Sequence, residues 1–180
     1  MRSSILIAAH NEGEALWQTI RSCVETCAGL DYEIVLADDA SVDDSVEEAR
    51  QRFPQLRVVR HDERRGAAPT KHLGAREARG DVLVFLDGHC KPEQGAISRL
   101  VQGVEETKGN AIVTPAIAGL DVRRWQNSPA QVGHGYFLDL EKFACGWLPL
   151  GEFRVVDAGR RRFYESPALI GCVLAVSHDL

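Results

Sequence analysis

The chain lacks any hydrophobic run long enough to cross a membrane. Its 180 residues are 44% hydrophobic and 26% charged, and the apolar stretches fall well short of the roughly 20 residues that a transmembrane helix needs. Met1 leads directly into the strand-like residues 3–9 and not into the basic and apolar segments of a secretory signal. We therefore expect one soluble globular domain with neither a signal peptide nor a membrane anchor.

Cysteine and positive charge are also in short supply. The five cysteines are an odd number at irregular spacings, and only Cys23 and Cys27 are close in sequence. They do not form the paired framework of small secreted domains, so the sequence predicts a reducing compartment and a cytoplasmic protein. Lysine and arginine number 21 against 26 acidic residues, a net charge of -5. This balance argues against nucleic acid as a partner.

Short apolar runs rich in β-branched residues alternate with longer segments of helical periodicity. The expected strands are residues 3–9, 32–38, 56–61, 81–87 and 110–117, and the expected helices are residues 12–28, 41–53, 67–79 and 93–107. Asn11 and Ser41 are expected to cap the first two helices, and Gly80 to follow the end of the third. This order predicts an α/β fold whose ligands bind at the carboxyl ends of the strands.

Three of these strand ends are unusually polar: residues 9–12, 38–41 and 87–89. The glycine-rich G-x-G-x-x-G motif of dinucleotide-binding folds and the G-x-x-x-x-G-K phosphate loop are both absent after the first strand. Asp39 could accept a hydrogen bond from a nucleobase N–H or a ribose hydroxyl, and Asp38 could cap the following helix. The alternative is that both are ordinary turn residues.

Asp87, Gly88 and His89 end the apolar run of residues 82–86. In an extended segment the carboxylate and the imidazole would point to the same side, and Gly88 would allow another group to approach closely. Such a pair suits Mn²⁺ or Zn²⁺ better than Ca²⁺, with water or substrate phosphates completing the shell. The alternative is that Asp87 caps a turn and His89 is a surface residue. Cys90 would point away from His89 and belong to the core.

Four segments occur in the order and approximate spacing of glycosyltransferases with the GT-A fold: "HNEGEALWQTIRSC", "IVLADDASVDDS", "RGAAPTKHLGAREARGDVLVFLDGHC" and "SPALIGCVLAVSHDL". The chain resembles the family 2-type glycosyltransferases and is most similar to the polypeptide N-acetylgalactosaminyltransferases. The resemblance implies a Rossmann-like nucleotide-sugar-binding fold with a mostly parallel mixed sheet between helices. It also implies one GT-A domain, with its nucleotide-binding part at residues 1–118 and the start of an acceptor-binding part at residues 119–180.

The resemblance further implies a UDP-sugar donor and a divalent metal, with Mn²⁺ favoured over Mg²⁺. The positions that match nucleotide-binding residues of the family are Ala9, His10, Glu12, Asp39, Lys71 and Asp87. His10 and Glu12 match residues of the uridine pocket, and Asp39 matches the acid that reads the uracil ring. Asp87 and His89 match the metal-binding D-x-H pair of the family.

Two positions depart from the family pattern. Lys71 falls where the relatives usually have an arginine near the base and the diphosphate, and a lysine cannot form the planar fork of an arginine. Gly171 and Cys172 fall in the sugar and acceptor part of the cleft, where the relatives tend to have two glycines. Cys172 therefore leaves the identity of the donor sugar open.

No general base is found in the chain. The later acidic motif and a third metal-binding histidine of the relatives follow the Gly171–Cys172 segment, so we expect a truncated domain whose base lies beyond Leu180 and which self-associates through an uncovered edge. The acceptor stays open among saccharide, peptide and lipid-linked molecules. Two alternatives to the transferase are a non-catalytic nucleotide-sugar-binding fragment and a sugar-phosphate nucleotidyltransferase. The residues after the first strand argue against the second, because they are neither glycine-rich nor basic.

Overall fold

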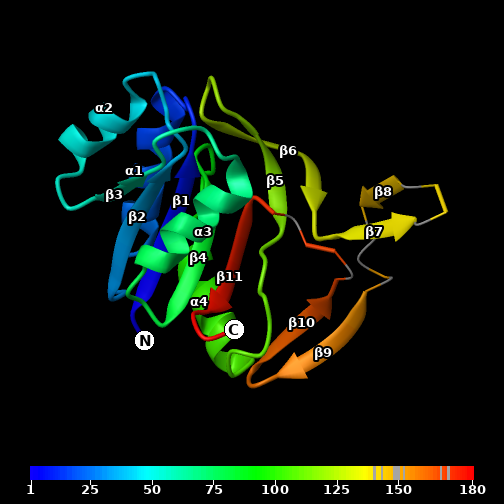
Figure 1. The fold of residues 1–180 in the computed structure, drawn as a ribbon. Helices are drawn as coiled ribbons and strands as arrows, with labels where there is room; N and C mark the ends of the chain where they lie inside the picture. The colour runs from blue at the N-terminus through cyan, green and yellow to red at the C-terminus, as the bar shows by residue number, and fades with distance from the viewer. Residues whose placement is uncertain (140, 143, 148–150, 152, 167, 170) are drawn as a thin grey trace.

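A five-stranded sheet forms the centre of the computed structural model, which describes residues 1–139, 141–142, 144–147, 151, 153–166, 168–169 and 171–180 (Figure 1). The strand order is β11-β4-β1-β2-β3. The four parallel strands are β1 (Ser3–Ala9), β2 (Tyr32–Asp38), β3 (Arg57–Arg60) and β4 (Val82–Asp87). The edge strand β11 (Val173–Ser177) pairs with β4 in the antiparallel direction. The sheet is thus mixed and mostly parallel, as predicted.

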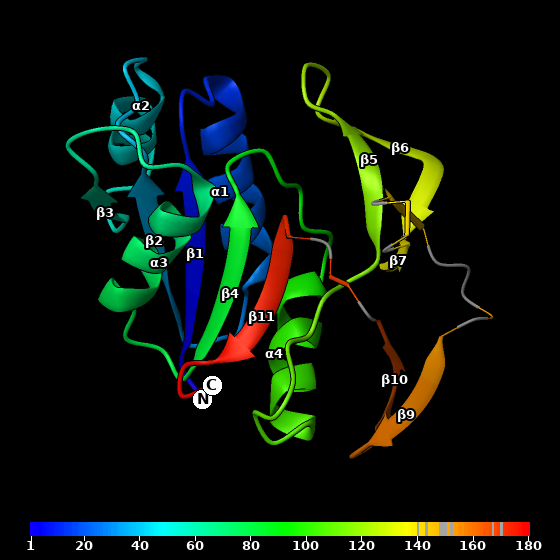
Figure 2. The ribbon, with the colours of Figure 1, turned by 45° about the vertical axis from the view of Figure 1, so that its right-hand side comes forward.

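Helices cover both faces of this sheet, so the arrangement has three layers (Figure 2). On one face, α1 (Glu14–Thr26), α2 (Ser45–Arg52) and α4 (Ala96–Glu106) bury the larger core cluster, which includes Ile7, Leu16, Leu36 and Leu100. On the other face, α3 (Ala67–Glu77) packs on a smaller cluster formed around Leu6, Val35 and Leu83. Successive strand residues point to opposite faces, which is why neighbours such as Leu6 and Ile7 belong to different clusters.

In the described part of the chain, three antiparallel ribbons follow α4. They are β5 (Ile117–Asp121) with β6 (Gln126–Gly133), β7 (Tyr136–Asp139) with β8 (Ala144–Trp147), and β9 (Arg154–Ala158) with β10 (Arg161–Glu165). Both views place them beyond β11, away from β3 (Figures 1 and 2). No helix of the described residues is both long enough and apolar enough to span a bilayer.

The strand predicted for residues 110–117 is wrong. Within that segment only Val113 reaches the sheet, through an isolated antiparallel bridge to Ala175 of β11. Pro115 has no backbone N–H to continue a ladder, and the next regular element is β5, which begins at Ile117. The fifth position of the sheet is instead filled by β11, from the other end of the chain.

The predicted helix caps are also wrong. Helix α1 begins after Gly13 and α2 after Asp44, and neither residue makes a side-chain capping hydrogen bond. Asn11 instead adopts a left-handed backbone conformation with φ 54°, which asparagine tolerates better than most residues. Its side chain is therefore available for the loop that follows β2.

Candidate nucleotide-sugar site at the carboxyl ends of β1, β2 and β4

Asn11 joins the loop after β1 to the loop after β2. Its backbone N–H donates to Ser41 Oγ at 3.0 Å, and its Oδ1 accepts from the Val42 N–H at 2.8 Å. The Gly13 N–H donates to Asp43 Oδ2 at 3.1 Å. These bonds hold two of the polar strand ends against each other, a role of Asn11 that the sequence pattern did not reveal.

Asp39 is buried, at 4% exposure, and its carboxylate holds the turn before α3. Oδ1 accepts from the Arg65 N–H at 2.6 Å, and Oδ2 accepts from the Gly66 N–H at 2.8 Å. Burial alone would raise the pKa of Asp39, but these amides and the Thr70 hydroxyl outweigh it and lower the pKa below 3.8. A carboxylate has about four acceptor positions, so Asp39 retains capacity for a further donor.

His10 lies against the same strand end. Its Nδ1 donates to the Asp39 carbonyl oxygen at 2.7 Å, and its Nε2 accepts from Asn11 Nδ2 at 3.1 Å. A carbonyl can only accept, so these two partners select the neutral tautomer with the proton on Nδ1. Asp38 next to Asp39 pairs with Arg60 and accepts from the Ser41 N–H at 2.9 Å, so it closes a turn and does not cap α2.

Lys71 connects three segments that are distant in sequence. Its Nζ lies 2.8 Å from Asp87 Oδ1 and donates to the Gly171 carbonyl at 2.7 Å. The Asp87 N–H donates to the Cys172 carbonyl at 3.0 Å. The structure therefore brings the predicted residues Lys71, Asp87, Gly171 and Cys172 together around one ammonium group.

Glu12 is the group that approaches Gly88. A Cβ on Gly88 would lie 2.7 Å from Glu12 Cγ, so a larger residue would force the Glu12 side chain to move. His89 Nδ1 donates to Glu12 Oε2 at 2.9 Å, and this hydrogen bond raises the pKa of His89 above its ordinary value. Residues 88–89 form a turn, so the prediction that Asp87, Gly88 and His89 lie in one extended segment is wrong.

A divalent ion at the predicted pair Asp87 and His89 would need further ligands beyond the side chains of the described residues. Within the described part of the chain, no group of three or more His, Cys, Asp and Glu side chains is arranged to hold a metal. The His89 Nδ1 bond to Glu12 leaves Nε2 for a ligand, and a carboxylate in this outer position is typical of metal-binding histidines. Asp87 keeps one carboxylate oxygen that does not face Lys71.

Two half-buried cysteines border this group. Cys90 packs against the larger core cluster, as predicted, and its thiol donates to the Cys172 carbonyl at 3.6 Å. A hydrogen bond from Cys90 lowers the pKa of the Cys172 thiol to about 7. The same interaction raises the pKa of Cys90, and burial raises it further.

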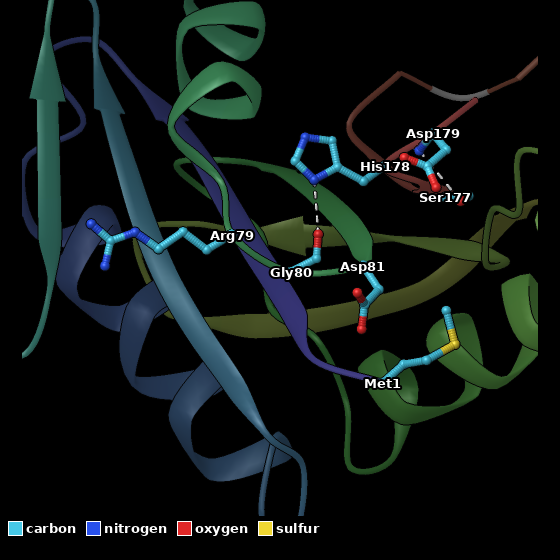
Figure 3. Close-up of a pocket in the computed structure, with 7 residues that line it drawn as sticks. All are labelled: Met1, Arg79, Gly80, Asp81, Ser177, His178 and Asp179. Atoms are coloured by element: carbon cyan, nitrogen blue, oxygen red, sulfur yellow. Dashed lines mark hydrogen bonds between the residues drawn. The ribbon is translucent and has the colours of Figure 1, made fainter.

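A pocket also opens at the opposite end of the sheet (Figure 3). Residues 79–81 before β4, Met1 and residues 177–179 line it, and His178 Nδ1 donates to the Gly80 carbonyl at 2.9 Å. None of the predicted site residues lies there. The amino ends of parallel strands are also not where ligands of α/β sheets bind, so we assign the site to the carboxyl ends.

Comparison with known proteins decides the family. The model of the family "Glycosyl transferase family 2" matches residues 4–165. The chain belongs to glycosyltransferase family 2. Among curated relatives, it is 38% identical over 141 residues to polypeptide N-acetylgalactosaminyltransferase 3 of Taeniopygia guttata, covering 74% of this chain and 23% of the relative. It is 36% identical over 172 residues to polypeptide N-acetylgalactosaminyltransferase 12 of Mus musculus, covering 92% of this chain and 29% of the relative. The chain thus spans less than a third of the length of either relative.

Solved structures confirm the GT-A fold of this family 2 chain. GalNAc-T7, crystallised with UDP, GalNAc and Mn²⁺, matches with a TM-score of 0.79 at 23% identity, covering 98% of this chain and 35% of that one. PcManGT, a mannosyltransferase from Pyrobaculum calidifontis in complex with GDP-Man and Mn²⁺, matches with a TM-score of 0.58 at 22% identity, covering 68% and 37%. The prediction of Mn²⁺ agrees with the metal present in both of these structures.

The prediction of a cytoplasmic location is wrong by this comparison, because the polypeptide N-acetylgalactosaminyltransferases are enzymes of the Golgi lumen. The prediction depended on the cysteines, all of which are free among the described residues. Free cysteines do not exclude an oxidising compartment.

We expect Asp39→Asn to lower the free energy of unfolding by about 1–3 kcal/mol at neutral pH, because an amide nitrogen would face one of two buried N–H donors. The folded-state pKa of Asp39 is lowered, so its contribution is present above the unfolded value of 3.8 and is lost as pH falls through the folded value. Urea unfolding of the parent protein and the variant along a series from neutral to acidic pH measures the difference. Asp62→Asn, at an exposed aspartate of the loop between β3 and α3, is the matched control. Equal losses in the two variants would contradict this role of Asp39.

Proposed function

We propose that the chain forms the donor-binding part of a metal-dependent glycosyltransferase that transfers a sugar from a UDP-sugar. The observation that carries the proposal is the convergence of Asp39, Lys71, Asp87 and His89 at one edge of the sheet, close to the turn at Gly171. We assign the nucleotide to residues 1–118 and the start of an acceptor-binding part to residues 119–180, which contain most of the three ribbons and the sheet strand β11.

The nucleoside would lie at the carboxyl ends of β1 and β2. Asp39 retains acceptor capacity for the N–H of a uracil ring, and its position is held by the Arg65 and Gly66 amides. His10 lies beside it with a defined tautomer. The fold itself does not select the base, because it binds UDP-GlcNAc in TarS of S. aureus and GDP-Man in PcManGT. We therefore infer the preference for uracil from Asp39 and His10.

The diphosphate would lie at the carboxyl end of β4. Asp87 and His89 would hold a divalent cation there, and such a cation neutralises charge on the diphosphate as the bond to the sugar breaks. Glu12 would orient the imidazole of His89 through its Nδ1 hydrogen. Lys71 is already within reach of Asp87 and would supply a second positive charge to the leaving group.

A panel of nucleotides tests the choice of base. In the presence of Mn²⁺, we expect calorimetry to show UDP binding at least about tenfold more tightly than CDP, GDP or ADP, since an unpaired buried group costs about 1–3 kcal/mol. A preference for either purine diphosphate would contradict the proposal. Turnover of a UDP-sugar panel with saccharide, peptide and lipid-linked acceptors then separates a transferase from a binding module.

A further inference from the structure

Two cysteines from distant parts of the chain meet beside Asp87. Cys90 follows His89 directly, and Cys172 lies in the turn before β11, 82 residues later. The Cys90 thiol lies 3.6 Å from the Cys172 backbone carbonyl oxygen, so the two residues are in contact. Both residues are half-buried, so the pair is packed into place but reachable by a small molecule.

The three other cysteines have different surroundings. Cys23 and Cys27 lie one helical turn apart at α1, and both are 0% exposed. Cys145 is exposed on the ribbon strand β8. Among the described cysteines, Cys90 and Cys172 are thus the pair that lies on two separate segments, in contact and within reach of solvent.

We propose that Cys90 and Cys172 form a reversible disulfide, which makes the pair a thiol-modification site next to the predicted metal pair. A small disulfide such as oxidised glutathione serves as the oxidant. One cysteine thiolate attacks it and releases one glutathione thiol, and the other cysteine attacks the resulting mixed disulfide and releases the second. The two cysteines together lose two protons and two electrons, and the oxidant is reduced to two thiols.

The disulfide would act on the groups that hold the site. The Cys172 carbonyl accepts from the Asp87 N–H, and the neighbouring Gly171 carbonyl accepts from Lys71 Nζ. Bond formation draws this turn toward Cys90 and removes the thiol hydrogen that Cys90 donates to Cys172. This part rests on the proposed function: we expect oxidation to weaken UDP binding about tenfold, as loss of outer-shell support does at metal sites.

Mass spectrometry tests the disulfide without reference to any nucleotide. The Cys145→Ser variant, which cannot form intermolecular bonds through Cys145, is incubated with oxidised glutathione, alkylated and digested. We expect a cross-linked Cys90–Cys172 peptide that disappears on reduction. Cys90→Ser in the same background is expected to lose the cross-link and to carry glutathione on Cys172. Oxidation that leaves both thiols free for alkylation, or that leaves only glutathione on Cys172 when Cys90 is present, would overturn the proposal.

Calorimetry with UDP and Mn²⁺ on the reduced and oxidised protein separates the two claims. A cross-linked protein whose reduced form does not bind UDP would contradict the proposed function and leave the disulfide standing. UDP binding without a cross-link would do the reverse. A cross-link that leaves UDP affinity unchanged would overturn the connection between the disulfide and the donor site.

Discussion

His89→Ala is expected to remove most of the mutual strengthening between Mn²⁺ and UDP binding. If Asp87 and His89 hold the metal only together with a diphosphate, each ligand must tighten the other by the same factor, because linkage is reciprocal. A factor of roughly 5 to 150 is typical of coupled sites, and the variant should bring it close to one. UDP binding without metal should change little, since Asp39 lies at a different strand end.

Calorimetric titrations of UDP at several Mn²⁺ concentrations, and of Mn²⁺ with and without UDP, measure both halves of this coupling. His72→Ala, at an exposed histidine of α3, is the matched control. Glu12→Gln should give a smaller loss, because an amide oxygen can still accept the His89 Nδ1 hydrogen but carries no charge. If His89→Ala leaves the Mn²⁺ dependence of UDP affinity intact, His89 does not bind the metal and the proposed metal site is wrong.

Gly80→Ala is expected to cause the largest loss of stability among single glycine substitutions in the sheet layer. A Cβ at this position would lie 2.6 Å from the Ser4 backbone nitrogen and 2.7 Å from the Ser3 carbonyl carbon. Both atoms belong to β1, which pairs with β2 and β4 and cannot move without disturbing both ladders. We expect a loss of about 3 kcal/mol, the upper part of the usual range for overpacking.

Urea unfolding followed by circular dichroism measures this loss. Gly151→Ala is the control, since a Cβ there meets no atom within 4 Å. A change in Gly80→Ala no larger than that of the control would show that β1 can shift to accept a methyl group.

The structure also gives a different reason for a glycine at position 80, which was expected to follow the end of α3 directly. The helix ends at Glu77, and the close approach to β1 explains the glycine instead.

The strands and helices that the sequence predicted are local features of the chain. The strands β1, β2, β3 and β4 and all four helices lie within the predicted ranges, apart from small differences at their ends. Each follows from the spacing of apolar side chains along a short segment, which is a property of consecutive residues. The three polar strand ends were found for the same reason, because each directly follows a predicted strand. Parallel strands place their carboxyl ends at one edge of the sheet, so these ends were expected to lie together.

Contacts between distant segments were not predictable in this way. The Lys71 contact with the Gly171 carbonyl joins residues 100 positions apart, and the Glu12 contact with His89 joins residues 77 positions apart. The sequence correctly indicated that Gly88 admits a close neighbour, but nothing in residues 82–92 identifies that neighbour as Glu12.

The sequence by itself determined the alternation of strands and helices, the edge of the sheet where polar groups gather, and the resemblance to family 2 glycosyltransferases. Only the tertiary structure decided that β11 forms the edge strand beside β4, that Lys71 faces Asp87, and that Cys90 contacts Cys172. The physical reason is that periodicity and turn chemistry are written in neighbouring residues. The partner of a side chain depends instead on how separate segments pack, which no single segment specifies.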